Sequence, residues 1–98
     1  MLFFIGWKPR LAGGTAEQEE GLEVFGRWQP PKGVEFQSMW SRADGGGFGI
    51  AEVQSSEALL EAMAPWAGTY LDFECCPIVD IQRGTEIAHA GIRFRKGG

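Results

Sequence analysis

The sequence predicts an α+β fold in which two β-α-β units share one antiparallel sheet. Segments that alternate apolar and polar residues, as half-buried strands do, flank two segments whose apolar residues have helical spacing. A chain of 98 residues has room for a single domain, residues 1–98, with a core at 1–80 and a C-terminal extension at 81–98. The opening segment, Met1–Trp7, is apolar at both odd and even positions, so a strand there needs cover on both faces.

Each predicted element has its own local signal. Thr15, with Gln18 three residues later, matches a capping box and starts the first helix, whose buried stripe contains Leu22 and Phe25. The turn at 43–46 contains Asp-Gly and joins the second and third strands into a hairpin. Ser55 or Ser56 caps the second helix. The predicted strands are 1–7, 34–42, 47–54 and 70–79, the helices run from Thr15 towards Trp28 and from Ser56 to about Trp66, and Ala12-Gly13-Gly14 is a loop.

The order β-α-β-β-α-β is that of a ferredoxin-like fold, with two helices on one face of a four-stranded antiparallel sheet. The other face of the sheet is then bare, although the first strand is apolar on both sides. Two such sheets packed face to face would bury this surface and form a barrel between two copies. The expected partner is therefore a second copy of the chain, as a homodimer.

The second and third strands differ in the residues they present. Small residues in the third strand leave space for either a helix or a ligand. In the second strand, uniform alternation predicts that Phe36 and Trp40 share one face, whereas Met39 and Ser41 lie on the other. Beyond Asp80 the pattern weakens, and we expect a short helix at 85–90 and a short terminal strand at 92–95.

Composition limits the classes of function. The net charge of −4 and the isoelectric point near 4.9 argue against nucleic acid as a partner. No apolar run is long enough to span a membrane, and no signal peptide is recognisable, so we expect a soluble cytoplasmic protein. Cys75 and Cys76 are adjacent and point to opposite faces of a strand, which predicts two free, mostly buried thiols. With a single histidine, His89, they form no metal-binding pattern, and we expect neither a metal nor a cofactor.

Several short motifs resemble a known family. They are Met1-Leu2-Phe3 with Trp7, Gly33-Val34 leading to Trp40, Gly46-Gly47-Phe48 leading to Glu52, and Asp72-Phe73-Glu74 followed by Pro77-Ile78-Val79. On these motifs the chain resembles the small dimeric α/β-barrel proteins, which include the antibiotic-biosynthesis-type monooxygenases. More narrowly, it resembles an uncharacterised branch known only as a domain of unknown function. The resemblance spans about residues 1–80 and implies a fold and a dimer, but no established activity.

Glu52 is the most suggestive residue for chemistry. It lies in a strand that is otherwise small and apolar, where a carboxylate must be paired, neutral or beside a cavity. In a pocket walled by Trp40 and Trp66, it could orient a ligand or act as a base. The alternative is a structural role, with Glu52 bonded to backbone or to Arg42.

Three further residues complete the predicted sites. Asp72 and Glu74 share one strand face and could do acid–base work or bind a hard cation, with Glu74 contacting a ligand, or they could simply face solvent. His89 could be a second catalytic base or a surface residue. Of the four tryptophans, we expect at most two to line a pocket and the others to serve the core.

These features support three hypotheses of function. The first is a dimeric protein that binds a small, partly aromatic or apolar molecule in a cavity between sheet and helices. The second is a cofactor-free enzyme of the monooxygenase or isomerase type, with Glu52 or His89 as the base. The third is a structural or interaction module whose bare sheet face binds another protein. The fold alone does not choose among them.

Overall fold

The computed structural model describes residues 1–10 and 14–98, and the predicted loop residues Ala12 and Gly13 lie outside this part of the chain. Its elements are β1 (Leu2–Pro9), α1 (Thr15–Arg27), β2 (Val34–Ser41), β3 (Gly47–Val53), α2 (Ser56–Met63), the 3₁₀ turn η1 (Ala64–Trp66), β4 (Leu71–Pro77) and α3 (Ile81–Arg95).

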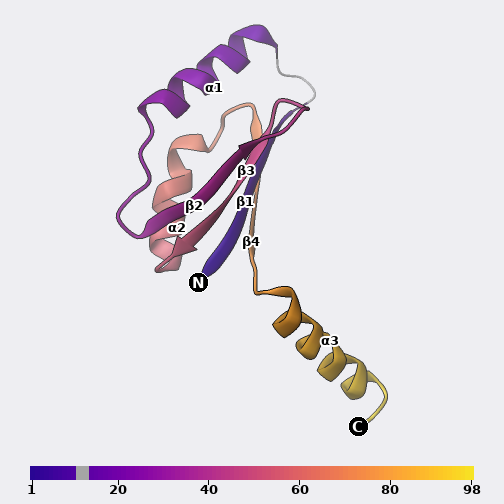
Figure 1. Cartoon of the computed structure of the whole chain (residues 1–98). Coiled ribbons are helices and arrows are strands. Elements are labelled where there is room, and N and C mark those ends of the chain that lie inside the picture. Colours follow the sequence, from indigo (N-terminus) through magenta and orange to yellow (C-terminus); the bar gives the residue numbers. More distant parts are fainter. Residues whose placement is uncertain (11–13) are drawn as a thin grey trace.

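The four strands form one antiparallel sheet in the order β2-β3-β1-β4. Helices α1 and α2 lie on the same side of it, and the opposite side carries no element (Figure 1), within the part of the chain that the structure describes. This confirms the predicted ferredoxin-like α+β class. We call the two sides the helix face and the open face.

The core lies between α2 and the helix face. Ala58 and Ala62 of α2 pack against Ile5, Ala51 and Val53, and each of these five side chains is buried. Because alanine is small, α2 approaches the sheet closely. The hydroxyl of Ser55 accepts a hydrogen bond of 3.1 Å from the Ala58 amide, which confirms a serine cap at this helix.

Helix α1 begins at Thr15, as predicted, but its capping residues differ from the prediction. Gly14, not Thr15, is the N-cap, and its amide donates to the carboxylate of Glu17 at 3.0 Å. Glu17 thus takes the place of Gln18 in the first turn, where a negative charge also interacts favourably with the helix dipole.

The small residues of β3 do not leave open space. The Trp7 ring covers Gly47, since a Cβ there would lie 2.6 Å from its Cζ2 atom, and the Phe36 ring covers Gly49 in the same way at 2.8 Å. Neighbouring strands therefore fill the room beside Gly47 and Gly49, whereas α2, as the sequence allowed, takes the room beside Ala51.

A β-bulge in β2 overturns the predicted facing of its second half. The register with β3 shifts between Phe36 and Ser38, so that Ser38 pairs with Ile50 and Trp40 pairs with Phe48. Since one extra residue exchanges the two faces of a strand, Trp40 reaches the open face. Met39 and Ser41 turn to the helix face instead.

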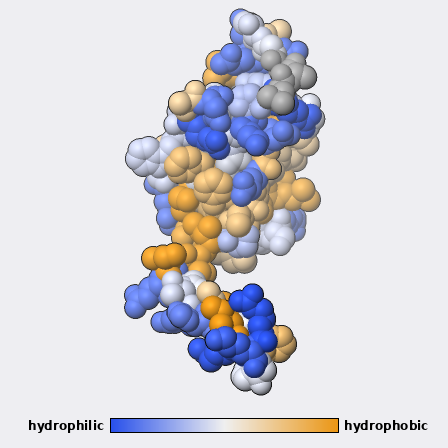
Figure 2. Space-filling model, turned by 90° about the vertical axis from the view of Figure 1, so that its right-hand side faces the viewer, coloured by the Kyte–Doolittle hydropathy of each residue, from blue (hydrophilic) through white to orange (hydrophobic). Residues whose placement is uncertain are grey.

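The open face is mainly apolar at its centre. Alternation and register place five apolar side chains on it, and a patch of hydrophobic surface is visible there (Figure 2). The Phe4 and Phe48 rings stack at 5.7 Å between centroids, and Trp40 is 60 % exposed. The five residues are Leu2, Phe4, Trp40, Phe48 and Ile50.

The C-terminal region differs most from the prediction. Residues 81–95 form one continuous helix, α3, in place of a short helix and a terminal strand. The carboxylate of Asp80 caps it by accepting from the Arg83 amide at 3.0 Å. The helix projects away from the sheet at the end of β4 (Figure 1). None of its fifteen residues, all of which the structure describes, is buried.

Candidate aromatic cleft beneath α1

A cleft of about 190 Å³ lies between α1 and the helix face of the sheet. Strands β1, β2 and β4 form its floor, η1 and the end of α2 form one wall, and α1 forms the roof. Its apolar lining is dominated by aromatic rings: Trp7, Phe25, Trp28, Phe36, Trp66, Tyr70 and Phe73, with Met39 and Met63 beside them.

The aromatic lining is a connected set of rings. Trp66 is central, with ring centroids 5.8 Å from Trp28, 5.7 Å from Phe73 and 6.4 Å from Phe25. Trp7 continues the set on the other side of Phe73 at 6.1 Å. Distances in this range suit tilted and edge-to-face ring pairs, so the rings fix one another's orientation.

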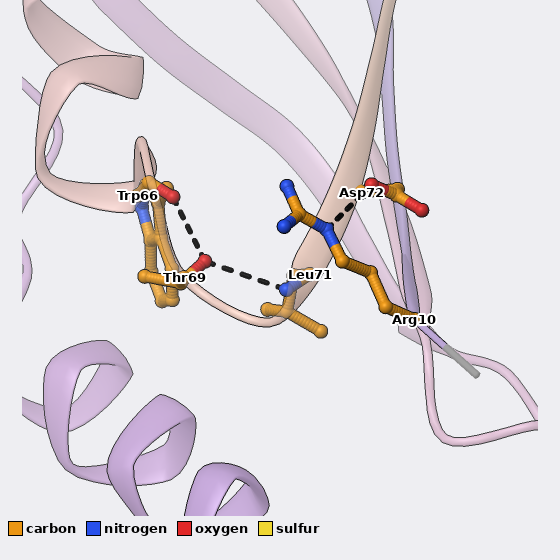
Figure 3. A network of polar contacts seen from close by, with 5 residues as sticks. All are labelled: Arg10, Trp66, Thr69, Leu71 and Asp72. Carbon is orange, nitrogen blue, oxygen red and sulfur yellow. Dashed lines mark hydrogen bonds and ion pairs between the residues drawn. The ribbon is translucent and has the colours of Figure 1, made fainter. Parts of the chain in front are cut away.

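The polar groups of Trp28 and Thr69, next to the rings, form hydrogen bonds with the protein itself. They therefore add no free polar atom to the cleft. The indole Nε1 of Trp28 donates to the Ala62 carbonyl at 3.1 Å, so this nitrogen turns towards α2. The turn after η1 is held by Thr69, whose hydroxyl donates to the Trp66 carbonyl at 2.8 Å and accepts from the Leu71 amide at 3.4 Å (Figure 3). These hydrogen bonds hold the backbone of Trp66 in place, and its ring forms one wall of the cleft.

Helix α1 covers the cleft without sealing it. Its one buried residue is Gly21, where an added Cβ would lie 2.9 Å from the Tyr70 ring, so the helix touches the turn before β4 there. Leu22 and Phe25 line the cleft but remain 66 % and 47 % exposed. The expectation that they form a buried stripe is therefore wrong. In α1 and the sheet as described, these two apolar side chains lack a full set of packing partners.

Of the predicted ligand-binding residues, Trp66 lies in this cleft. It is only 6 % exposed, and its ring forms part of the wall. Trp40 lies on the opposite face of the sheet because of the bulge in β2, so the structure does not bring Trp40 and Trp66 together. Trp7 and Trp28 join Trp66 in the cleft, which makes three lining tryptophans where at most two were expected.

Glu52 and Glu74 lie on the open face, away from the cleft. The Glu52 carboxylate accepts from the N-terminal ammonium of Met1 at 2.8 Å, and its side chain is 50 % exposed. Glu74 pairs with Gly6 across the sheet and is exposed. His89 is exposed on α3. The structure therefore does not assemble Glu52, Glu74 and His89 into one site.

Asp72 also lies on the open face, in the edge strand β4. Its carboxylate accepts from Nε of Arg10 at 2.9 Å and joins the end of β1 to β4 (Figure 3). Both side chains are about half exposed, so the pair contributes little to stability.

The two cysteines are free, as predicted, but both are exposed rather than mostly buried. Cys75 pairs with Ile5 and points to the helix face, whereas Cys76 pairs with Phe4 on the open face. Partial burial raises the pKa of the Cys75 thiol above its ordinary value.

Two other kinds of site are absent from the described residues. No group of three His, Cys, Asp or Glu side chains within 1–10 and 14–98 is arranged to hold a metal ion. In the same ranges, no helix has the length and apolar character needed to cross a bilayer.

Three lining residues, Leu22, Phe25 and Phe73, were not predicted as part of a site. All three are apolar residues at ordinary helix or strand positions, and nothing in their spacing separates a cleft wall from a packed core. Only the position of α1 relative to the sheet makes the distinction.

Comparison with known proteins agrees with the narrower of the two resemblances. Neither the curated proteins nor the solved structures contain a match to this chain. A family model matches residues 1–92, which is further along the chain than the motifs at 1–80 and includes most of α3. The chain therefore belongs to the family DUF3303, a domain of unknown function.

Proposed function

We propose that this protein binds a small, flat, mainly apolar molecule in the cleft beneath α1. The observation that carries the proposal is the partial exposure of Leu22 and Phe25 over an aromatic floor. Apolar side chains that face a cleft without filling it gain free energy when a ligand displaces the water beside them. Small-molecule sites typically combine such an apolar lining with a few polar groups.

The polar lining residues suggest the chemical class of the ligand. Gln18, Ser41 and Tyr70 contribute an amide and two hydroxyls at the edges of the cleft. None of the described lining residues is Asp, Glu, His, Lys or Arg. A charged ligand would lose its hydration without gaining an ionic partner, so the cleft favours a neutral aromatic compound with one or two hydrogen-bonding atoms.

The lack of charged residues among the described lining residues also counts against the enzyme hypothesis. A cofactor-free monooxygenase or isomerase needs a base within hydrogen-bonding reach of its substrate. Glu52 and His89 were the expected bases, and neither is among the described residues that line the cleft. Binding therefore has better support than catalysis at this position.

The test uses the fluorescent probe N-phenyl-1-naphthylamine, a neutral aromatic amine whose emission rises in apolar surroundings. We expect saturable binding to the wild-type chain, accompanied by energy transfer from the lining tryptophans. Leu22→Lys should weaken binding at least about 10-fold, because it places a charge in the cleft. Leu22 is 66 % exposed, so this change should leave the fold intact.

Leu60→Lys is the matched control. Leu60 is a helical leucine of similar exposure, 71 %, and it does not line the cleft. It should leave probe affinity unchanged. Equal losses in the two variants, or no saturable binding to the wild-type chain, would overturn the proposal.

A further inference from the structure

The chain exposes more surface than a monomer of its size should. Its accessible area is 7235 Å², whereas a compact monomer of 10.8 kDa is expected to expose about 5,500 Å². Its radius of gyration is 16.7 Å, compared with about 13 Å for a compact domain of this length. The excess, roughly 1,700 Å², is of the size that each chain of an obligate homodimer buries.

Much of this excess belongs to α3, which has an apolar side with nothing against it. At 100° per residue, Ile81, Ile87, Ala88 and Ile92 fall on one side of the helix, with Phe94 at its border, and Gln82 and His89 fall on the other. Gly84 and Gly91 share the apolar side, and Arg95 is the one charged residue on it. Ile81 is 86 % exposed and Phe94 is 81 % exposed. An amphipathic helix of this kind normally packs its apolar side against another surface.

The open face of the sheet is the other uncovered apolar surface of the chain, and it matches α3 in length. The helix spans about 20 Å from Ile81 to Phe94, and the seven-residue strand β3 spans about 23 Å. Figure 2 shows hydrophobic surface on the sheet and on the helix below it. Packing one surface on the other would bury both.

Charge is also complementary between the two parts of the chain. Residues 1–80 contain twelve Asp and Glu against five Lys and Arg, whereas residues 81–98 contain one Glu against four Lys and Arg. On the open face, Glu52 and Asp72 are paired with the N-terminus and with Arg10. Glu35 and Glu74, on the two edge strands, make no ion pair among the described residues. They are therefore available to a basic helix.

The joint between β4 and α3 favours a second chain over the same chain as the binding partner. Sheet pairing continues to Ile78, whose amide donates to the Leu2 carbonyl at 2.9 Å. Only Val79 and Asp80 separate this bond from α3, and Asp80 is already engaged as the helix cap. In this conformation α3 points away from its own sheet (Figure 1).

We propose that α3 of one chain lies across the open face of a second copy, and that the second copy returns the same contact. The result is a symmetric dimer with exchanged C-terminal helices. The proposal concerns the face opposite to the cleft, so it does not depend on ligand binding there.

The test begins with sedimentation velocity of the full-length chain, which should be a dimer. The arm variant, Ile87→Lys with Phe94→Lys, places two charges seven residues apart on the apolar side of α3. It should weaken self-association at least about 100-fold, because those charges would have to be buried. Both residues are exposed within one chain, at 51 % and 81 %, so folding should not suffer. The control, Gln82→Lys with His89→Lys, has the same spacing on the polar side and should remain a dimer.

The face variant, Glu35→Lys with Glu74→Lys, reverses the two unpaired carboxylates and should also be monomeric. Both residues are exposed, so this variant should fold. Mixing the two variants is the decisive step, because the arm variant keeps an intact face and the face variant keeps an intact arm. The mixture should form a heterodimer with one restored contact.

Other outcomes overturn the proposal and identify what covers these surfaces instead. A dimeric arm variant would indicate sheet-to-sheet packing without α3. A dimeric face variant would indicate contact between α3 helices alone. A monomeric wild-type chain would indicate that α3 packs on its own sheet, binds another protein or stays in solvent.

Discussion

Replacing Gly49 with alanine tests how the helix face of the sheet is packed. A Cβ at this position would lie 2.8 Å from Cδ1 of Phe36 and 2.9 Å from the carbonyl oxygen of Ser38. Ordinary Cβ contacts begin near 3.4 Å, so both neighbours must retreat by about half an ångström. The Phe36 ring can move aside. The Ser38 carbonyl cannot move as easily, because it belongs to the bulged backbone of β2.

The free energy of unfolding should therefore fall. Overpacking of this kind costs about 1–3 kcal/mol, and removing a glycine from a strand returns roughly 0.5–1 kcal/mol. The net loss of about 1–2 kcal/mol corresponds to a decrease in Tm of roughly 5–15 °C for a domain of this size. Thermal unfolding followed by circular dichroism measures it.

Gly26→Ala is the control, because an added Cβ on this α1 residue meets nothing within 4 Å. It should stabilise the helix by up to about 1 kcal/mol. The two glycine-to-alanine changes should thus shift Tm in opposite directions. A Gly49→Ala protein as stable as wild type would refute the packing of β2 against β3 described above.

Three further experiments each test one local feature of the structure. Ser55→Ala should lower the free energy of unfolding by about 1 kcal/mol through loss of the α2 cap, whereas Ser56→Ala should change it little, as urea unfolding of both variants will show. Alkylation of the arm variant, whose open face is uncovered, by iodoacetamide near pH 8, followed by mass spectrometry, should modify Cys76 before Cys75, because burial raises the pKa of Cys75 and leaves less of it as the reactive thiolate; equal rates would contradict this. Glu52→Gln should change Tm by only a few degrees and leave probe binding intact, because the ion pair it breaks is exposed; a large loss of probe affinity would instead restore Glu52 as a site residue.

The sequence was sufficient for the fold class because the relevant signals are local and repeated. A run that is apolar at odd and even positions marks β1, and alternation marks β2. Helical spacing marks α1 and α2, and the Ser55 cap and the Asp44-Gly45 turn fix two of the boundaries. The order of the elements then leaves few topologies. Where the pattern was ambiguous, the prediction failed. Ile92 and Phe94 alternate with arginines like a strand, yet they continue the helix that Asp80 caps.

The candidate site was less predictable because it depends on distances between elements. The sequence could identify Trp66 as a wall, but it could not show that α1 stands far enough from the sheet to leave Leu22 and Phe25 exposed. Glu52 looked anomalous in an apolar strand, and its partner is the N-terminal ammonium of a neighbouring strand. No spacing rule predicts a partner that is 51 residues away in sequence.

The bulge in β2 divides the tryptophans between two separate surfaces. Without the extra residue between Phe36 and Ser38, Trp40 would face the cleft and Met39 would face the open side. With it, three tryptophans line the cleft, and Trp40 extends the apolar open face while remaining 60 % exposed. A large aromatic side chain gains free energy from cover, and none is available within one chain as described. The same one-residue shift that leaves room in the cleft thus adds to the surface that we propose a second copy covers, and the two proposals can be tested independently because they concern opposite faces of one sheet.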